Sequence, residues 1–184
     1  MATTLMLIDI QNDYFPGGRM ELEGSTEAGL VARHLLTHFR RNHLPVVHIQ
    51  HIAAHPGATF FLPGTEGAKV HECVHPLEGE TIIQKHFPNA FRETGLLEHL
   101  HGEKVARLLI AGMMTHMCVD ASTRAAADLG FECCIASDAC ATRRLNREGR
   151  SVAAEDVHLA FLAALDGTYG QVLPAQELLA RLDA

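Results

Sequence analysis

Short runs of apolar residues alternate along the chain with longer segments in which apolar residues recur every three or four positions. A short apolar run between polar turns is typical of a strand that is buried on both faces. Such strands are predicted at residues 4–10, 45–49, 81–83, 106–111, 132–136 and 171–173. Helical spacing predicts helices over residues 26–41, 94–100, 115–129, 150–165 and 175–182.

This alternation favours an α/β fold with a mostly parallel sheet that is covered on both faces. Residues 52–74 depart from the pattern, because they are rich in glycine, proline and histidine and show no clear period. A connection of this length is either a functional loop or a disordered one. With 184 residues and no repeat or linker, the chain is expected to form one domain over residues 1–184.

Charge and cysteine content narrow the class of protein. Lys and Arg number 15 against 22 Asp and Glu, and the net charge of −7 argues against nucleic acid and anionic membranes as partners. The first residues show neither a basic leader nor a spanning segment, so a soluble cytoplasmic protein is expected. The five cysteines are odd in number, and Cys133 adjoins Cys134, which fits neither a disulfide framework nor a CxxC zinc pattern.

Three reactive side chains follow three of the predicted strands. Asp9 lies in LIDIQND, Lys85 lies in TIIQKHF, and Cys118 lies a few residues beyond the strand at 106–111. In an open parallel sheet, ligands bind beyond the carboxyl ends of the strands. A carboxylate, an ammonium and a thiol are therefore expected to share one edge of the sheet.

The stretch GMMTHMCVDAS, residues 112–122, gives Cys118 a candidate role. With Thr115 as the N-cap, Cys118 is expected at the third helical position, where the helix dipole favours the thiolate. Lys85 would then hold the thiolate, and Asp9 would accept its proton. Taken singly, each residue has a structural interpretation: an inert core cysteine, an aspartate in a turn and a solvated lysine. Their conjunction at three strand ends favours the catalytic interpretation.

Four stretches carry a resemblance to a known family: LMLIDIQNDYF, QKHFPNAF, GMMTHMCVDASTRAAADLGF and SDACAT. In these stretches the chain resembles the isochorismatase-like cysteine hydrolases, which include nicotinamidases and carbamoylsarcosine amidohydrolases. The resemblance implies a three-layer α/β/α sandwich with a six-stranded parallel sheet. It also implies a catalytic triad of Asp9, Lys85 and Cys118, a cis peptide between Met113 and Met114, and an oxyanion hole formed by the N–H groups of Met114 and Cys118.

The activity implied by the resemblance is hydrolysis of a C–N bond in a small amide or carbamoyl compound through a thioester on Cys118. No cofactor is expected. The protein is expected to form a homo-oligomer, either a dimer or a tetramer. Two other functions stay open: an isochorismatase that splits a vinyl ether, against which the presence of Cys118 counts, and a thiol redox protein that uses Cys118. A nucleotide-binding module is disfavoured because GxGxxG and P-loop motifs are absent.

The region after the second predicted strand differs from the nicotinamidase pattern. Nicotinamidases of the family bind a metal there through an aspartate and histidines, whereas this chain has His51 in place of the aspartate and Ala53 in place of a histidine. No metal is therefore expected. Whether the loop histidines converge on one is left open; these are His51, His55, His71 and His75.

Substrate contacts are expected close in sequence to the three catalytic positions. The candidates are Gln11, Phe15, Phe91 and His116. Phe60 and Phe61 lie on the long loop and would form part of a lid. The alternative is core packing for each aromatic side chain, and a turn for Gln11.

Overall fold

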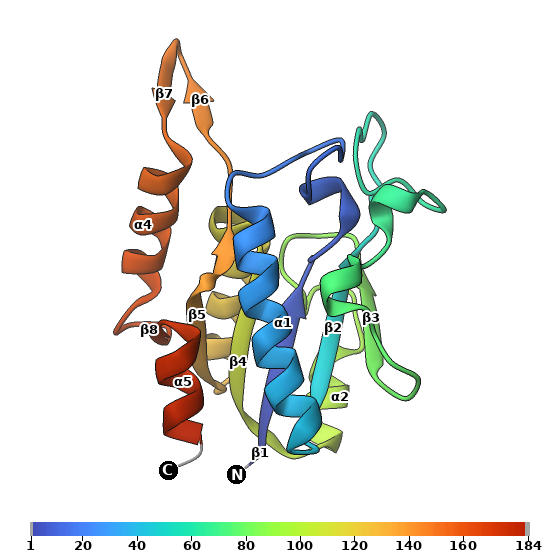
Figure 1. Cartoon of the computed structure of the whole chain (residues 1–184), viewed down its shortest axis with the longest axis vertical. Coiled ribbons are helices and arrows are strands. Elements are labelled where there is room, and N and C mark those ends of the chain that lie inside the picture. The colour runs from blue at the N-terminus through green and yellow to red at the C-terminus, as the bar shows by residue number, and fades with distance from the viewer. Residues whose placement is uncertain (1, 183–184) are drawn as a thin grey trace.

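The computed structural model of the chain describes residues 2–182 and contains a six-stranded sheet in which every neighbouring pair is parallel (Figure 1). The strand order is β3-β2-β1-β4-β5-β8. The strands are β1 (Ala2–Ile8), β2 (Val46–His51), β3 (Thr81–Lys85), β4 (Val105–Met113), β5 (Glu132–Ala141) and β8 (Gln171–Leu173).

Helices cover both faces of this sheet. In Figure 1, α1 (Ser25–Arg41) and α5 (Ala175–Leu182) lie in front of it. The opposite face packs against α2 (Leu96–Gly102), α3 (Asp120–Asp128) and α4 (Ala154–Leu165). The predicted three-layer α/β/α sandwich is thus confirmed. No helix within residues 2–182 has the length and apolarity that a membrane crossing requires.

The central strand shows why the sheet needs both layers. Successive side chains of β1 point to opposite faces. Leu5 and Leu7 pack into the core beneath α1 and α5, while Met6 and Ile8 pack into the core on the other face. A strand that buries both faces favours apolar side chains, which explains the apolar run at residues 5–8.

The backbones of β1 and β4 approach each other closely at Gly112. This residue is paired with Ile8 and has a φ of 142°, and a Cβ atom built on it would lie 2.0 Å from the carbonyl oxygen of Ile8. Only glycine fits such a position. The close approach sets Asp9, which follows Ile8, beside Met113, which follows Gly112.

The predicted helix over residues 150–165 is wrong in its first turn. Residues 145–152 form a two-stranded antiparallel hairpin, β6 (Leu145–Arg147) with β7 (Arg150–Val152), and α4 begins only at Ala154. The turn residues of the hairpin, Glu148 and Gly149, have φ values of 51° and 75°. Two consecutive positive φ angles are typical of a tight hairpin turn. The hairpin projects away from the sheet at the top of Figure 1.

The long segment between β2 and β3 has little regular structure, as expected. It contains two short 3₁₀ turns, η2 (Glu66–Ala68) and η3 (Glu72–Val74), and a third, η1 (Asn12–Tyr14), follows β1. The N–H of Asn12 donates to the carbonyl of Lys69, and the N–H of His71 donates to the carbonyl of Ile10. The segment after β2 therefore lies against the segment after β1, over the carboxyl ends of the strands.

Candidate active site

Lys85 lies at the centre of a buried polar cluster at the carboxyl ends of β1, β2 and β3. Its ammonium donates to Asp9 Oδ2 at 2.7 Å, to His51 Nδ1 at 2.9 Å, and to Cys118 Sγ and the carbonyl of Phe87 at 3.2 Å each. The side chain of Lys85 is fully buried. The structure thus brings Asp9, Lys85 and Cys118 together, with His51 as a fourth member.

The arrangement follows from strand register. His51 and Lys85 end neighbouring parallel strands and are paired in register, so their side chains lie on the same face of the sheet. Asp9 directly follows β1, and its N–H donates to the carbonyl of Ile49 on β2 at 3.0 Å. Asp9 has a φ of 50°, a conformation that is uncommon outside glycine and concentrates at functional sites.

The two oxygens of the Asp9 carboxylate differ in their partners. Oδ2 accepts from Lys85, whereas Oδ1 is buried without a hydrogen-bond partner among residues 2–182. A carboxylate oxygen of Asp9 and Sγ of Cys118 lie within 4.8 Å of each other. Asp9 therefore has an unused acceptor in the same small volume as the thiol, as a base for that thiol requires.

Cys118 is carried by a π-helical turn, η4 (Thr115–Val119), that joins β4 to α3. The expected N-cap at Thr115 is wrong: the turn is preceded by Met114, and Thr115 Oγ1 instead contacts His158 Nδ1 on α4 at 2.9 Å. The hydroxyl therefore ties the turn to a neighbouring helix rather than capping its own. The peptide bond between Met113 and Met114, expected to be cis, is cis.

The expectation that the Cys118 thiol ionises easily is also wrong for the resting protein. Burial raises the pKa of this thiol, and the nearby Asp9 carboxylate raises it further, while Lys85 lowers it. Only 5 % of the residue is exposed. A thiol with a raised pKa rests in the protonated form, so any nucleophilic reaction of this sulfur must begin with the loss of its proton.

Lys85 is held in its charged form and His51 in its neutral form. Burial by itself would lower the pKa of the Lys85 ammonium, but Asp9 and Cys118 raise it above its ordinary value, so Lys85 stays charged. Burial and the positive charge of Lys85 lower the pKa of His51 to about 4. The 4.0 Å approach of His51 Nδ1 to Asp9 Oδ2 is therefore not an ion pair at neutral pH.

The cluster does not fit a metal ion. Asp9, His51 and Cys118 are the only group of three potential ligands that converge within residues 2–182, and each offers an atom within 4.8 Å of the others. The ammonium of Lys85, however, lies within hydrogen-bond distance of all three. A metal cation bound by them would face this like charge at short range, which is strongly unfavourable away from water.

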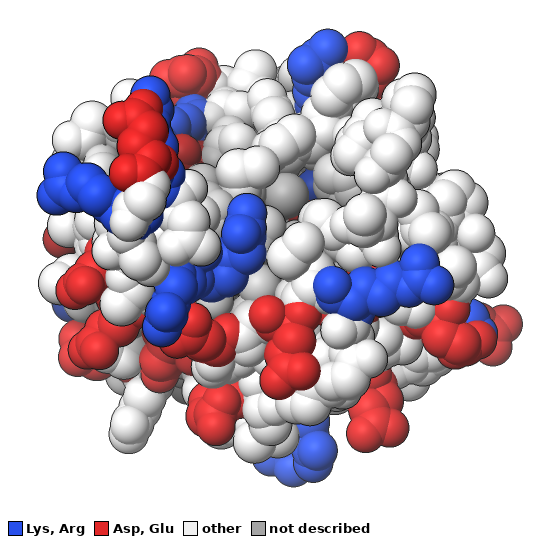
Figure 2. Space-filling model, turned by 90° about the horizontal axis from the view of Figure 1, so that it is seen from above, with Lys and Arg blue, Asp and Glu red and all other residues white. Residues whose placement is uncertain are grey.

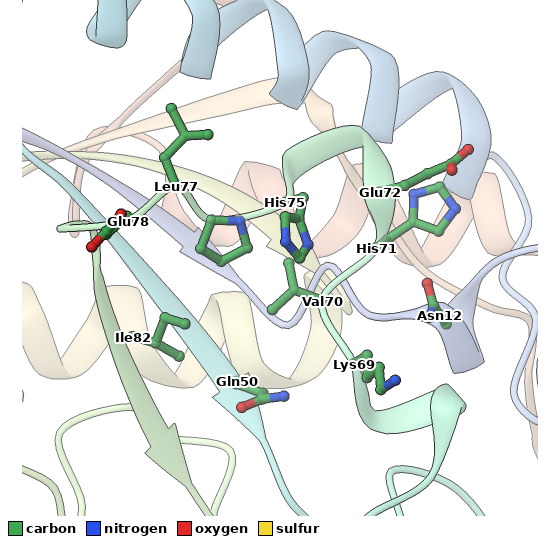
Figure 3. Close-up of a pocket in the computed structure, with 11 residues that line it drawn as sticks. Asn12, Gln50, Lys69, Val70, His71, Glu72, His75, Leu77, Glu78 and Ile82 are labelled. Atoms are coloured by element: carbon green, nitrogen blue, oxygen red, sulfur yellow. The ribbon is translucent and has the colours of Figure 1, made fainter.

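The loop histidines, whose convergence was left open, do not form a group of converging metal-ligand atoms with His51 within residues 2–182. His71 stacks on Phe15 with ring centroids 3.6 Å apart, and His55 is exposed beside Pro56. His71 and His75 line a separate cavity of about 610 Å³, together with Gln50 of β2 (Figure 3). None of Asp9, Lys85 and Cys118 lines this cavity, so it is distinct from the cluster.

Four residues were expected to contact substrate, and the structure gives each of them another partner. The Gln11 side chain is fully buried and hydrogen-bonded to the backbone of His51 and Ala68. Phe15 is buried against His71, and Phe91 packs against Phe131 with ring centroids 6.1 Å apart. His116 Nδ1 contacts the hydroxyl of Thr142, and its ring packs edge-on against Phe161.

Phe61, on the long loop, lies beside the cluster, with its ring centroid 5.9 Å from that of His51. Phe61 is buried, its N–H donates to Asp13 Oδ2 at 2.7 Å, and its ring lies 4.6 Å from that of Tyr14. Burial raises the pKa of Tyr14 well above its ordinary value, and the nearby Cys118 and Asp9 raise it further. Tyr14 was not predicted, although its position five residues after Asp9 was a usable signal.

The cluster lies below the face of the molecule that is formed by the carboxyl ends of the strands. Figure 2 views this face, in which a hollow opens near the centre with charged side chains around it. The cluster is nearly closed to solvent, since Asp9 and Lys85 are fully buried and Cys118 almost so.

Comparison with known proteins identifies the family of the chain. The family model for the isochorismatase domain matches residues 3–169. The isochorismatase family protein YddQ of Bacillus subtilis is 49% identical over 179 residues, which are 97% of this chain and 99% of the relative. Maleamate amidohydrolase of Pseudomonas putida is 30% identical over 60% of this chain and 47% of the relative.

Among solved structures, an isochorismatase hydrolase from Oleispira antarctica superposes with a TM-score of 0.93. It is 48% identical and covers 97% of this chain and 96% of its own. The family match includes Asp9, Lys85 and Cys118. The chain therefore belongs to the isochorismatase family and is an enzyme of the hydrolase type found in that family.

Proposed function

We propose that the protein is a cysteine-dependent amidohydrolase that cleaves the C–N bond of a small amide or carbamoyl compound, with Asp9, Lys85 and Cys118 as its catalytic triad. The observation that carries the proposal is the buried ammonium of Lys85, which bridges the Asp9 carboxylate at 2.7 Å and the Cys118 sulfur at 3.2 Å. A fixed positive charge between a base and a thiol stabilises the thiolate that forms when the proton moves.

The first half-reaction begins with proton transfer from Cys118 to Asp9. The sulfur then attacks the carbonyl carbon, and the carbonyl oxygen becomes an oxyanion that the N–H groups of Met114 and Cys118 stabilise. Asp9 returns the proton to the leaving nitrogen as the C–N bond breaks, which releases ammonia or an amine and leaves a thioester. Lys85 stays protonated, in agreement with its raised pKa.

In the second half-reaction, water hydrolyses the thioester. Asp9 accepts a proton from the attacking water, the C–S bond breaks, and the proton returns to the sulfur of Cys118. The acid is released and the resting thiol is restored, with its raised pKa. No metal takes part, because the ammonium of Lys85 already contacts the three side chains that would have to bind one.

The experiment is a panel of small carboxamides, ureas and carbamoyl compounds, with ammonia release as the signal. Wild type is compared with Cys118→Ala and with Cys140→Ala, a second buried cysteine outside the cluster, with chelator in half the wells. Release should vanish in Cys118→Ala, persist in Cys140→Ala and ignore chelator. Turnover by Cys118→Ala would contradict the proposal. So would a loss of wild-type turnover when chelator is added. Cleavage of isochorismate without any amide turnover would favour the vinyl ether hydrolase instead.

The expected cellular setting and assembly are further parts of this proposal. All five cysteines are free thiols, which suits a reducing, cytoplasmic compartment. A dimer or tetramer is expected from the family resemblance, and sedimentation equilibrium measures it directly. A monomer at micromolar concentration would contradict that expectation.

A further inference from the structure

His51 has one ring nitrogen in use and one free. The ammonium of Lys85 has only hydrogens to give, so Nδ1 of His51, 2.9 Å away, must accept and carries no proton. In a neutral imidazole the hydrogen is then on Nε2. Within residues 2–182 this Nε2 has no hydrogen-bond partner, and it is not among the buried unsatisfied atoms, so it is open to solvent.

The backbone of His51 is clamped from both sides by one side chain. Gln11 Oε1 accepts from the His51 N–H at 2.8 Å, and Gln11 Nε2 donates to the His51 carbonyl at 2.9 Å. Gln11 is fully buried, which limits its motion. The ring is further limited by Phe61, whose centroid lies 5.9 Å from it. A donor held this firmly at a reactive cluster costs little entropy when it binds a ligand.

The charges around the ring keep it neutral. Lys85 adjoins it on β3, Asp9 follows β1, and His86 and His55 are the other titratable groups that face it. Burial and Lys85 depress its pKa to about 4, against the opposing effect of Asp9. Only 17% of the side chain is exposed. At neutral pH the tautomer is thus fixed by Lys85 rather than by solvent.

The strand order separates this donor from the expected oxyanion hole. β2 and β4 flank β1 on opposite sides, so His51 and Met114 lie on either side of Asp9. A substrate whose carbonyl oxygen points to the Met114 side leaves the His51 donor unfilled. A second acceptor on the substrate, on the β2 side, would fill it.

We propose that His51 is a positioning residue for Lys85 through Nδ1 and a substrate-binding residue through its Nε2–H, which selects amides with a second hydrogen-bond acceptor beside the scissile carbonyl. This inference rests on the proposed amide hydrolysis for its substrate class. Its two halves belong to two different nitrogens of one ring, and two substitutions separate them.

Asparagine and glutamine each reproduce one side of the ring. His51→Asn places an amide oxygen near the position of Nδ1 and removes the outer donor, while His51→Gln places its amide group near Nε2 and removes the acceptor for Lys85. On the amide with the highest kcat/KM, His51→Asn should raise KM about fivefold, as expected for one net hydrogen bond. His51→Gln should lower kcat by about tenfold while KM stays within about twofold. His55→Asn, an exposed neighbour, is the matched control and should behave as wild type.

A second measurement does not depend on amide turnover. Iodoacetamide alkylates Cys118: a C–S bond forms, the C–I bond breaks with loss of iodide, and the thiol proton passes to Asp9. The reacting carbon of iodoacetamide is its CH₂ group, so its carbonyl lies beside the reacting carbon, where the second acceptor of a substrate would lie, and can accept from His51. Iodoethane offers no such acceptor. His51→Asn should therefore raise the iodoacetamide concentration at which alkylation is half-saturated by about fivefold. The rate of alkylation by iodoethane should stay unchanged. Peptide mass spectrometry assigns the label to Cys118.

These measurements distinguish the two proposals. Equal effects of His51→Asn and His51→Gln on every parameter, or wild-type behaviour of both, would overturn the role of His51. So would ¹⁵N chemical shifts that place the ring proton on Nδ1 at neutral pH. Absence of amide turnover together with the expected iodoacetamide pattern would refute the amidohydrolase proposal and support the role of His51.

Discussion

Asp9 Oδ2 and Lys85 Nζ lie 2.7 Å apart, and both side chains are fully buried. A buried ion pair is costly to form, but removal of one partner is costlier, because it leaves an unpaired charge away from water. Asp9 and Lys85 are therefore coupled in stability as well as in the proposed reaction.

Lys85→Met should abolish turnover and lower the free energy of unfolding by about 3–5 kcal/mol, since it leaves the Asp9 carboxylate unpaired. The double variant Asp9→Asn with Lys85→Met should recover part of this stability without activity. Urea unfolding measures both, with Lys69→Met as the control because Lys69 pairs with Glu66 on the surface. A Lys85→Met protein as stable as wild type would contradict the coupling.

Gly112→Ala should destabilise the protein by more than about 2 kcal/mol, because a side chain at this φ is strained and its Cβ would meet the carbonyl oxygen of Ile8 at 2.0 Å. Thermal unfolding followed by circular dichroism measures the change. Gly102→Ala is the matched control, since a Cβ there meets nothing within 4 Å. If both variants melt at the same temperature, the close approach of β1 and β4 is wrong.

Stability should fall in acid partly through Glu80. Burial alone would raise the pKa of this carboxyl, but hydrogen bonds from Arg40, from the Leu77 N–H and from His48 lower it to about 2. A depressed pKa in the folded state contributes stability above the unfolded value of about 4.3, and this contribution is lost as the pH falls toward 2.

In Glu80→Gln, the free energy of unfolding should therefore decrease less between about pH 5 and about pH 3 than it does in wild type. These two pH values bracket the unfolded pKa. Urea midpoints at the two pH values measure it. Glu66→Gln, at a site whose side chain is 80% exposed, should leave the acid dependence as in wild type. An acid dependence in Glu80→Gln equal to that of wild type would show that the hydrogen bonds to Glu80 do not contribute to the loss of stability in acid.

Thr115→Val should lower kcat by about tenfold, because the contact between Thr115 Oγ1 and His158 Nδ1 ties the turn of Cys118 to α4. Steady-state kinetics and the rate of Cys118 alkylation both report the change. Thr37→Val, whose hydroxyl bonds only within its own helix, is the control. Wild-type kcat in Thr115→Val would show that the turn holds its position without this contact.

Much of the site was predictable because it lies at strand ends. Apolar runs located the strands, and the shared edge of a parallel sheet brought together Asp9, Lys85 and Cys118 as expected. The role of His51 was not predictable, because it depends on β2 and β3 being neighbours with His51 in register with Lys85. The sequence order of strands does not specify their order in the sheet.

The errors have local causes. The helix predicted from residue 150 includes the second strand of the hairpin, residues 150–152, although Gly149 after Glu148 is a turn signal. Thr115 was assigned as a cap because its type favours that position, but His158 of α4 competes for its hydroxyl. The ease of ionisation of Cys118 was judged from helix position alone, whereas burial, which only the tertiary structure reveals, dominates its pKa.

Cys118 should form a covalent thioester with an amide substrate. Rapid acid quench during turnover, followed by mass spectrometry of the peptide that contains Cys118, detects this intermediate. We expect an acyl adduct on Cys118 whose mass equals that of the substrate without its leaving amine, and no adduct on the other four cysteines. Steady turnover without any adduct on Cys118, together with activity in Cys118→Ala, would contradict it.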